Sequence, residues 1–331
     1  MRPARRVGSS YENRPDQARR HETDGDDTES DDTEGQDPKR HDTEGMERTT
    51  VLRIAVPNKG ALSEPAIAML REAGYRVRRD GRELVVVDGE NEVEFFYLRP
   101  RDIAVYVGSG TVDCGITGRD LLLDSGSSAV EVLGLDFGAS TFRYAARPGE
   151  VAEVADIAGR RVATSYAGLV SAHLARLGVE AEVVRLDGAV ETAITLGVAD
   201  VIADVVETGA TLRSQGLQVF GEPILRSEAV LIRRADNGEP PEVAVLHRRL
   251  LGVITARTYV LMDYDVPATL IDAACAVTPG LESPTVSPLR DPRWVAVRAM
   301  VPRKQTNRIM DELYTLGARG ILVTDIHACR L

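Results

Sequence analysis

The stretch from Glu191 to Leu212 constrains the fold of this chain more than any other part of it. Its sequence, ETAITLGVADVIADVVETGATL, predicts a short helix over Glu191–Leu196 that ends at Gly197, and then a strand over Asp200–Val206. The strand is apolar and rich in β-branched residues, as buried parallel strands are. A polar turn follows and opens a second helix. A strand, a turn and a helix in this order predict an α/β fold with ligands at the carboxyl ends of the strands.

The turn after this strand has the composition of a phosphate-binding site. A glycine and two hydroxyl groups at the start of a helix present backbone N–H groups to an anion. No lysine follows the glycine, which excludes the P-loop of nucleoside triphosphatases. The alternative is an ordinary link in which Thr208 or Thr211 caps the helix. The predicted phosphate-binding residues are Glu207, Thr208, Gly209, Ala210, Thr211 and Leu212.

Three acidic residues near this turn are candidates for binding a sugar. Asp204 is a carboxylate inside an apolar strand, where it is costly without a partner such as the hydroxyl groups of a ribose. Asp187 and Glu191 lie in the preceding strand-to-helix turn, DGAVE. Their alternative role is structural, with Asp187 as the N-cap and Glu191 as its capping partner.

The fixed positions of the stretch also carry a resemblance to a known family. They are Glu191, Gly197, Ala199, Ile202, Asp204, Thr208-Gly209 and Thr211-Leu212. Their spacing resembles the signature of the ATP phosphoribosyltransferase family, which catalyses the first step of histidine biosynthesis. The resemblance covers about residues 51–331. It implies that the turn holds the 5′-phosphate of phosphoribosyl pyrophosphate, whose phosphoribosyl group is transferred to N1 of ATP with release of pyrophosphate.

Composition sets the broad class. The chain has 331 residues, of which 43% are hydrophobic, enough for two or three domains, and no apolar run is long enough to cross a bilayer. We therefore expect no membrane partner, and the arginines after Met1 lack the apolar segment of a secretory signal. The net charge of −11 argues against nucleic-acid binding. A cytoplasmic location is predicted by three widely separated cysteines, Cys114, Cys275 and Cys329.

Residues 1–48 differ from the rest of the chain. They contain a degenerate acidic repeat with almost no apolar residues, as in DTES and DTEG. Such a segment cannot bury enough surface to offset its ordering entropy, so we predict a disordered acidic tail. Met46 lies just before the first predicted strand and is a candidate for the true start of translation.

The remaining chain alternates between strands and helices and divides into three parts. We predict lobe I over 51–147 and 226–250, lobe II over 148–225, and a third part over 252–331. The resemblance implies that the two lobes form a catalytic domain of the periplasmic-binding-protein type. The third part has the order βαββαβ of ferredoxin-like domains. It resembles the regulatory domain of the long-form transferases, which binds histidine as a feedback inhibitor and self-associates, so the resemblance implies a homo-oligomer, dimer or hexamer.

Local patterns predict further elements. Tyr75–Arg79 alternates as a strand, and Glu242–Leu251 is predicted to be a helix that bridges to the third part. Ser63 is predicted to cap a helix with Pro65 in its first turn. His173 and His247 are predicted to occupy exposed helical positions, and the five histidines form no catalytic group in the sequence.

Cationic side chains follow several predicted strands. The resemblance to the family implies that the contacts of ATP and pyrophosphate are Lys59, Arg99, Arg119 and Asp120. A solvated turn lysine is the alternative for Lys59, and Asp120 is the type of residue that orients an arginine or caps a helix. The segment from Phe142 to Tyr144 either lines the cleft or packs in the core. No dedicated metal cage is evident, so we expect Mg²⁺ to be carried mainly by the pyrophosphate.

The resemblance also implies an effector site in the third part. The residues that match its histidine pocket are Asp265, Leu281, Thr285, Met300 and Gly320. The alternative for Asp265 is turn chemistry before Pro267.

Two other functions stay open at this point. A two-lobed protein that binds an amino acid or nucleotide without catalysis would share the fold. A nucleobase phosphoribosyltransferase of the common type would usually carry paired acidic residues directly before its Thr-Gly turn. Here Val205 and Val206 separate Asp204 from that position.

Overall fold

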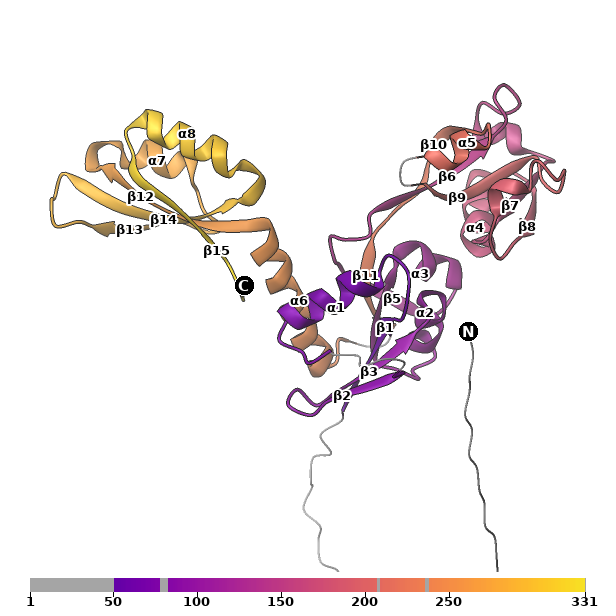
Figure 1. Ribbon diagram of the computed structural model, residues 1–331, viewed down its shortest axis with the longest axis horizontal. Helices are drawn as coiled ribbons and strands as arrows, with labels where there is room; N and C mark the ends of the chain where they lie inside the picture. Colours follow the sequence, from indigo (N-terminus) through magenta and orange to yellow (C-terminus); the bar gives the residue numbers. More distant parts are fainter. Residues whose placement is uncertain (1–50, 78–82, 207–208, 236–237, 331) are drawn as a thin grey trace, which may run out of the picture. The chain divides into compact units, whose positions relative to one another are not determined.

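The computed structural model describes residues 51–77, 83–206, 209–235 and 238–330. These residues form three β-sheets with helices packed against them, which confirms the predicted α/β class (Figure 1). The predicted acidic tail lies outside the described residues. None of the helices in the described ranges is long and apolar enough to cross a membrane.

The first sheet has six strands in the order β2-β3-β1-β4-β11-β5. β1 pairs in parallel with β3 and β4, whereas β11 is antiparallel to both β4 and β5. The chain thus leaves this sheet after β5 and returns as β11. The strands are β1 (Leu52–Pro57), β2 (Val85–Asp88), β3 (Val93–Leu98), β4 (Cys114–Gly118), β5 (Ala129–Gly134) and β11 (Ala229–Arg234). Its helices are α1 (Ser63–Glu72), α2 (Pro100–Gly108), α3 (Arg119–Ser125) and α6 (Pro241–Thr258).

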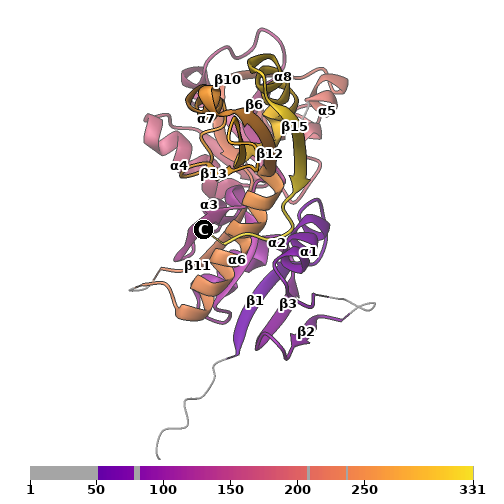
Figure 2. The same ribbon diagram turned by 90° about the vertical axis from the view of Figure 1, so that its left-hand side faces the viewer.

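Successive residues of β1 pack in two different cores, because side chains alternate across a strand. Ile54 packs with Leu70 of α1 and Leu246 of α6. Ala55 packs on the other face with Ile103 of α2. Both faces of the sheet are therefore covered. A ligand can reach this sheet only at the ends of its strands. Helices α1 and α6 lie side by side (Figure 2).

The second sheet has five strands in the order β10-β6-β9-β7-β8. Helix α4 covers the face that carries Phe142 and Tyr144, and the opposite face packs Ile202 against Leu212 of α5. The strands are β6 (Ser140–Ala146), β7 (Arg161–Thr164), β8 (Glu182–Arg185), β9 (Val201–Val206) and β10 (Gln218–Ser227). The helices are η1 (Val154–Ile157), α4 (Ala167–Leu177), η2 (Val190–Thr192) and α5 (Ala210–Ser214). The buried strand predicted over Asp200–Val206 is confirmed as β9.

Two connections join the first sheet to the second, one from β5 to β6 and one from β10 to β11. Glu228 holds them together. One of its carboxylate oxygens lies 3.0 Å from the Arg119 guanidinium, and the other accepts the Asp136 N–H at 3.0 Å. Two sheets with paired crossings confirm the predicted two-lobed, periplasmic-binding-protein-like fold.

The third sheet is antiparallel, with the order β13-β14-β12-β15. Its element order is βαββαβ, which confirms the predicted ferredoxin-like module. Helices α7 and α8 pack on one face, against Met262 and Tyr264. The strands are β12 (Tyr259–Pro267), β13 (Thr285–Pro288), β14 (Trp294–Pro302) and β15 (Arg319–Asp325). The helices are η3 (Ala268–Leu270), α7 (Ile271–Val277), η4 (Arg303–Gln305) and α8 (Thr306–Leu316).

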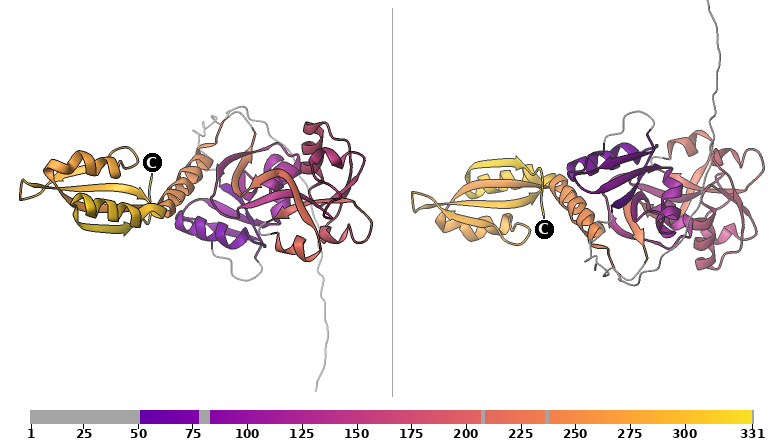
Figure 3. Two further views of the ribbon diagram at one scale, coloured as in Figure 1. Left: turned by 90° about the horizontal axis from the view of Figure 1, so that it is seen from above. Right: turned by 90° about the horizontal axis from the view of Figure 1, so that it is seen from below.

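The helix predicted over Glu242–Leu251 is too short. Helix α6 continues to Thr258 and passes without a loop into β12 (Figure 3). Gly252 lies inside the helix, where a Cβ would clash with the Cys329 carbonyl oxygen. The absence of a side chain at Gly252 therefore allows the backbone at Cys329 to pack closely against α6. The division of the chain at residue 252 falls inside α6 and stays a prediction.

Three other local predictions are wrong. Residues 75–77 are not in a strand, although Tyr75 and Val77 are buried in the first core, and residues 78 and 79 lie outside the described ranges. Ser63 does not cap α1, since its hydroxyl donates to the Pro57 carbonyl at 2.8 Å. The helix predicted over Glu191–Leu196 is a 3₁₀ turn of Val190–Thr192.

A glycine in the central strand β4 provides a test of the packing. A Cβ on Gly115 would lie 2.7 Å from Ile103 Cγ2 and 3.1 Å from the Ala55 carbonyl oxygen. We expect Gly115→Ala to lower the free energy of unfolding by about 1–3 kcal/mol, because overpacking forces the core apart. Urea denaturation followed by circular dichroism measures the change.

The matched control is Gly89→Ala, because a Cβ at Gly89 meets no atom within 4 Å and its backbone conformation suits any residue. Equal losses of stability in the two variants would contradict the packing of β4 against α2.

Candidate active site

The turn after β9 has a backbone that requires glycine. Gly209 precedes α5 with φ +68° and ψ 9°, in the left-handed region. The N-cap residue of the helix is Gly209, which has no side chain, and Thr211 lies inside the helix. The alternative in which Thr211 caps the helix is therefore wrong. Glu207 and Thr208 lie outside the described residues.

A cavity of about 320 Å³ lies against this turn, a size at the lower end for small-molecule sites. It brings together the sugar-binding candidates Glu191 and Asp204 with the described part of the predicted phosphate-binding turn. Its lining residues are Glu191, Asp204, Val205, Val206, Gly209, Ala210, Thr211 and Leu212. Asp187 is not among them and is exposed.

Asp204 is a half-buried carboxylate in an unfavourable electrostatic environment. Burial raises its pKa above the ordinary value of 3.8, and the carboxylates of Glu191 and Asp120 raise it further. Among the described residues, the one contact that lowers the pKa is the Val205 N–H, which donates to Oδ1 at 2.7 Å. No lysine or arginine in the described ranges pairs with it. The site therefore concentrates negative charge next to the turn, where a sugar hydroxyl or a bound cation would stabilise the ionised form.

Asp120 is fixed at the connection between the sheets. Its carboxylate accepts the hydroxyl of Ser227 at 2.8 Å, and its N–H donates to the same hydroxyl oxygen at 3.1 Å. Asp120 is buried and touches Ser227, so the helix-capping alternative is not the arrangement seen.

Tyr166 belongs to the same region and was missed by the sequence reasoning. Burial raises the pKa of its hydroxyl, and the nearby Asp120 carboxylate raises it further. The Arg101 guanidinium lies 4.9 Å from the centre of the Tyr166 ring and pairs with Asp124 at 2.7 Å. The available signal was position, because Tyr166 lies between β7 and α4, at a strand exit like those of the predicted cations.

Arg119 has its charge balanced inside the protein. Its guanidinium donates to Glu131 at 2.7 and 2.8 Å and to Glu228 at 3.0 Å. These hydrogen bonds raise its pKa. Arg119 thus braces the two connections, and its contact with ATP or pyrophosphate stays a prediction.

Lys59 and Arg99 lie beyond the carboxyl ends of two paired parallel strands. The Asn58 N–H donates to the Leu98 carbonyl at 2.8 Å, so the exits of β1 and β3 are adjacent. Both cationic side chains are exposed. They share the strand edge where α/β folds bind ligands.

The structural alternative for Asp187 and Glu191 is wrong. The residue before η2 is Ala189, with φ +49°, and no side chain caps the turn. For the segment over 142–144, the core alternative holds for its two aromatic residues, because Phe142 and Tyr144 are fully buried.

The exposed positions predicted for two histidines are wrong. His173 is half-buried, and its Nδ1 lies 3.1 Å from the Tyr144 hydroxyl. His247 is also half-buried, and its Nδ1 lies 3.2 Å from Glu239. Among the described residues, no group of three or more His, Cys, Asp or Glu side chains is arranged to hold a metal ion.

The third sheet brings part of the predicted effector site together. A Cβ on Gly320 would lie 3.7 Å from Asp265 Oδ2, and Gly320 has φ +60°. Met300 pairs with Leu261 on the sheet face opposite the helices, the face that also carries Asp265. Thr285 begins β13, and Leu281 is exposed in the loop before it.

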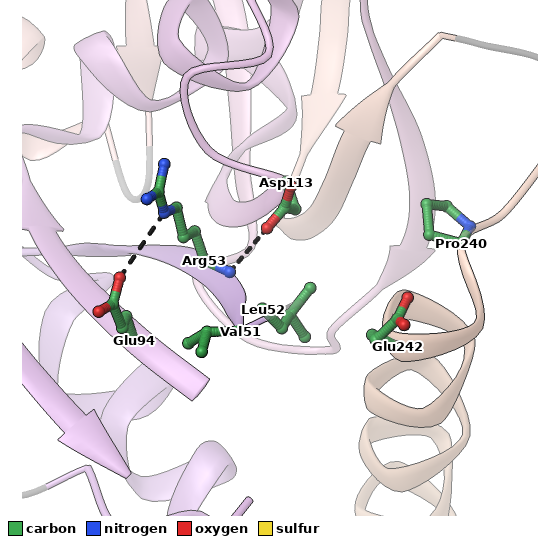
Figure 4. Close-up of a pocket in the computed structure, with 7 residues that line it drawn as sticks. All are labelled: Val51, Leu52, Arg53, Glu94, Asp113, Pro240 and Glu242. Carbon is green, nitrogen blue, oxygen red and sulfur yellow. Dashed lines mark hydrogen bonds and ion pairs between the residues drawn. The ribbon is translucent and has the colours of Figure 1, made fainter. Parts of the chain in front are cut away.

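A larger hollow of about 560 Å³ lies at the start of β1, away from the carboxyl ends of the parallel strands (Figure 4). Arg53 is one of the residues that line it. The Arg53 N–H donates to Asp113 at 2.7 Å, and its guanidinium lies 3.6 Å from Glu94. None of the predicted site residues lines this hollow.

Two α/β lobes joined by paired connections, with a ferredoxin-like module after them, define the class of a two-lobed, periplasmic-binding-protein-like fold with an additional C-terminal domain. Comparison with known protein families identifies the family within this class. The family model described as ATP phosphoribosyltransferase matches residues 99–252, and the one described as HisG, C-terminal domain matches residues 256–328.

Curated relatives from the same family are similar in sequence over 85% of this chain. An ATP phosphoribosyltransferase from Pseudarthrobacter chlorophenolicus is 66% identical over 284 residues, which are 85% of this chain and 100% of the relative. One from Streptomyces coelicolor is 65% identical over 286 residues, with the same coverage. A solved structure, the ATP phosphoribosyl transferase (HisG:HisZ) complex from Thermotoga maritima, has a TM-score of 0.54 and 24% identity, over 61% of this chain and 98% of that one.

The chain therefore belongs to the ATP phosphoribosyltransferase family, in its long form with the C-terminal domain. It is a transferase of the first step of histidine biosynthesis, which confirms the expectation drawn from the signature.

The raised pKa of Asp204 gives a prediction with a definite sign. Because burial and two carboxylates favour its protonated form in the folded state, its ionisation lowers stability as pH rises above 3.8. We expect Asp204→Asn to gain stability relative to the parent between about pH 4 and about pH 7. Thermal unfolding at several pH values measures the difference.

Asp200→Asn is the control of opposite sign. Hydrogen bonds from Arg161 lower the pKa of Asp200, so its carboxylate stabilises the fold above its ordinary pKa. This variant should be less stable than the parent at every pH above 3.8, and the difference should shrink only as the pH falls below 3.8. If the change in stability relative to the parent had the same sign and the same pH dependence in both variants, the environment assigned to Asp204 would be contradicted.

Proposed function

We propose that the cavity beside the turn is the phosphoribosyl pyrophosphate site of the transferase reaction. The observation that carries the proposal is the position of two carboxylates, Asp204 and Glu191, in one cavity with the start of α5. Gly209, whose backbone is left-handed, is the N-cap residue of that helix. Backbone N–H groups at such a turn suit a 5′-phosphate. The full predicted set for it is Glu207, Thr208, Gly209, Ala210, Thr211 and Leu212.

Asp204 and Glu191 are then placed to accept hydrogen bonds from the ribose hydroxyls. Ionised carboxylates accept such bonds strongly, and each bond offsets part of the cost of burying Asp204. Asp187, the third predicted ribose contact, is exposed in the loop before η2 and would need to approach the bound sugar.

The reaction needs little from acid or base groups. The lone pair of adenine N1 forms the new bond to C1 of the ribose while the bond from C1 to the pyrophosphate oxygen breaks, and the pyrophosphate leaves with the electron pair. The protein contributes by holding the two polyanions in line and by stabilising charge on the leaving group. We propose that Lys59 and Arg99 meet phosphate groups of ATP or pyrophosphate from the edge of the first sheet, together with Arg119 and Asp120.

We propose Mg²⁺ as a companion of the pyrophosphate. No group of three or more carboxylates in the described ranges is arranged to hold it alone, but Mg²⁺ usually combines one or two carboxylates, such as Asp204 or Glu191, with phosphate oxygens and water. When bound, the ion would neutralise the diphosphate and the carboxylates together. Without it, the two groups of like charge would repel each other.

We propose that histidine binds to the third module and inhibits the enzyme as a feedback inhibitor. Asp265, Gly320, Met300, Thr285 and Leu281 form the predicted pocket. The carboxylate of Asp265 suits the ammonium group of an amino acid, and Gly320 leaves open space beside it. Self-association into dimers or hexamers through this module is proposed as well. The sheet face that carries Asp265 and Met300 has no helix packed on it. We also propose a cytoplasmic location, with three cysteines as free thiols.

The turn is tested by a pair of glycine variants. Gly209→Ala strains a left-handed residue beside the cavity and places its Cβ 3.2 Å from the Arg213 guanidinium. We expect KM for phosphoribosyl pyrophosphate to rise about tenfold or more, and KM for ATP to change much less, because only the first substrate uses the turn. Initial rates with each substrate varied in turn measure both constants.

Gly216→Ala is the matched control. Gly216 follows α5 with φ +69°, so the backbone strain is similar, but it does not line the cavity. Equal effects on the two substrates, or the same shift in both variants, would contradict the phosphate assignment.

The effector site is tested by Asp265→Asn. Loss of the charge should weaken histidine inhibition about 5–150-fold, the range of typical coupling between sites. Asp263→Asn is the control, because Asp263 is on the same face of β12 but pairs with Arg298 at 2.6 Å. Dose–response curves of enzyme activity against histidine concentration measure the inhibition in each variant. Equally weakened inhibition in Asp263→Asn would indicate that histidine binds elsewhere.

A further inference from the structure

A second cavity, of about 500 Å³, lies where the two connections join the sheets. It shares Val206 with the cavity of the turn, so the two adjoin at the end of β9. Its lining includes two arginines and three hydroxyl groups. The residues are Arg119, Ala139, Ser140, Thr141, Val206, Arg226, Ser227 and Glu228.

Strand register places one of these arginines on the face that carries the proposed ribose site. Arg226 of β10 is directly opposite Thr141 of β6, and Thr141 is directly opposite Val206 of β9. Directly opposite residues of antiparallel strands point to the same face. The next pair on this face is Arg143 and Asp204. Arg226, Val206 and Asp204 therefore share one face of the second sheet.

The distance is suitable for a long side chain. Neighbouring strands are about 4.8 Å apart, so the backbones at Arg226 and Val206 are separated by about 10 Å. Arg226 can thus approach a ligand over β9 from the side away from η2. α4 packs on the other face, behind Phe142 and Leu225, and does not block this approach.

The charge of Arg226 has no partner in the described part of the chain. Its side chain is exposed, and none of the hydrogen bonds or ion pairs there involves its guanidinium. Arg119, in the same cavity, is held by Glu131 and Glu228. The Thr141 hydroxyl donates to the Val206 carbonyl at 2.9 Å, and the Ser227 hydroxyl serves Asp120. Arg226 is thus the cation of this cavity whose charge is not already balanced.

Phosphoribosyl pyrophosphate carries anions at both ends of its ribose. With the 5′-phosphate at the turn and the ribose over Asp204, its diphosphate must lie away from α5. The carboxylates of Asp204 and Glu191 would repel it, so a cation is needed on this side. We propose that Arg226 binds the diphosphate of phosphoribosyl pyrophosphate in the second cavity. This proposal rests on the proposed function of the turn.

Arg226 then has a chemical task in the reaction. As the bond between C1 and the diphosphate oxygen breaks, the electron pair moves to that oxygen and its charge increases. A guanidinium that donates two parallel N–H bonds stabilises this charge more than it stabilises the intact substrate. Arg226 therefore acts on kcat as well as on substrate binding.

The test compares Arg226→Met with Arg176→Met. Both remove one positive charge and keep an unbranched side chain, but Arg176 is exposed on α4, which covers the other face of the sheet. Inorganic pyrophosphate with Mg²⁺, as a product inhibitor, probes the second cavity, and ribose 5-phosphate probes the turn. We expect Arg226→Met to weaken inhibition by pyrophosphate roughly tenfold or more. Inhibition by ribose 5-phosphate should stay within about twofold in both variants, and Arg176→Met should not change inhibition by pyrophosphate.

Gly209→Ala separates this proposal from the one it rests on. If Arg226→Met leaves inhibition by pyrophosphate unchanged while Gly209→Ala weakens inhibition by ribose 5-phosphate, the role of Arg226 is refuted and the turn assignment stands. If Gly209→Ala leaves inhibition by ribose 5-phosphate unchanged, the assignment of the 5′-phosphate to the turn is refuted, and the proposal for Arg226, which rests on it, is refuted as well. Equal weakening of pyrophosphate inhibition by Arg176→Met would show a general charge effect and would overturn the proposal.

Discussion

The arrangement of the two lobes depends on the interaction of Glu228 with both connections between the sheets. Its carboxylate accepts the Arg119 guanidinium and the Asp136 N–H. The adjacent Ser227 binds Asp120 through a reciprocal pair of hydrogen bonds. These contacts bring the end of β4 next to the crossing strands. The carboxylate of Asp120 consequently raises the pKa of Asp204, a residue of the other sheet.

Negative charge in the site explains why the reaction requires cations from elsewhere. The site combines carboxylates with substrates that are themselves polyanions, and the net charge of the chain is −11. Arg119 is neutralised by its own partners. Cations at the strand exits, Arg226 on β10 and a magnesium ion carried by the substrate would together offset the repulsion. On the proposed assignment, binding of the ligand would offset the cost of ionising Asp204, a common relation between stability and function at binding sites.

Sequence patterns predicted the parts of this site that are local in the chain. The β-branched run of β9 and the glycine after it were sufficient for the strand and the turn, and the cost of a carboxylate among apolar residues identified Asp204. Arg226 was missed because strand pairing, not local sequence, places it opposite Thr141, which is far away in the chain. Tyr166 was missed although it lies at a strand exit, between β7 and α4.

The most direct test of the account is a crystal structure with phosphoribosyl pyrophosphate and Mg²⁺ bound. The account predicts the 5′-phosphate against the backbone N–H groups at the start of α5, the ribose hydroxyls within hydrogen-bond distance of Asp204, and the diphosphate towards Arg226. A 5′-phosphate bound instead at Lys59 and Arg99 on the first sheet, with the cavity of the turn empty, would contradict it.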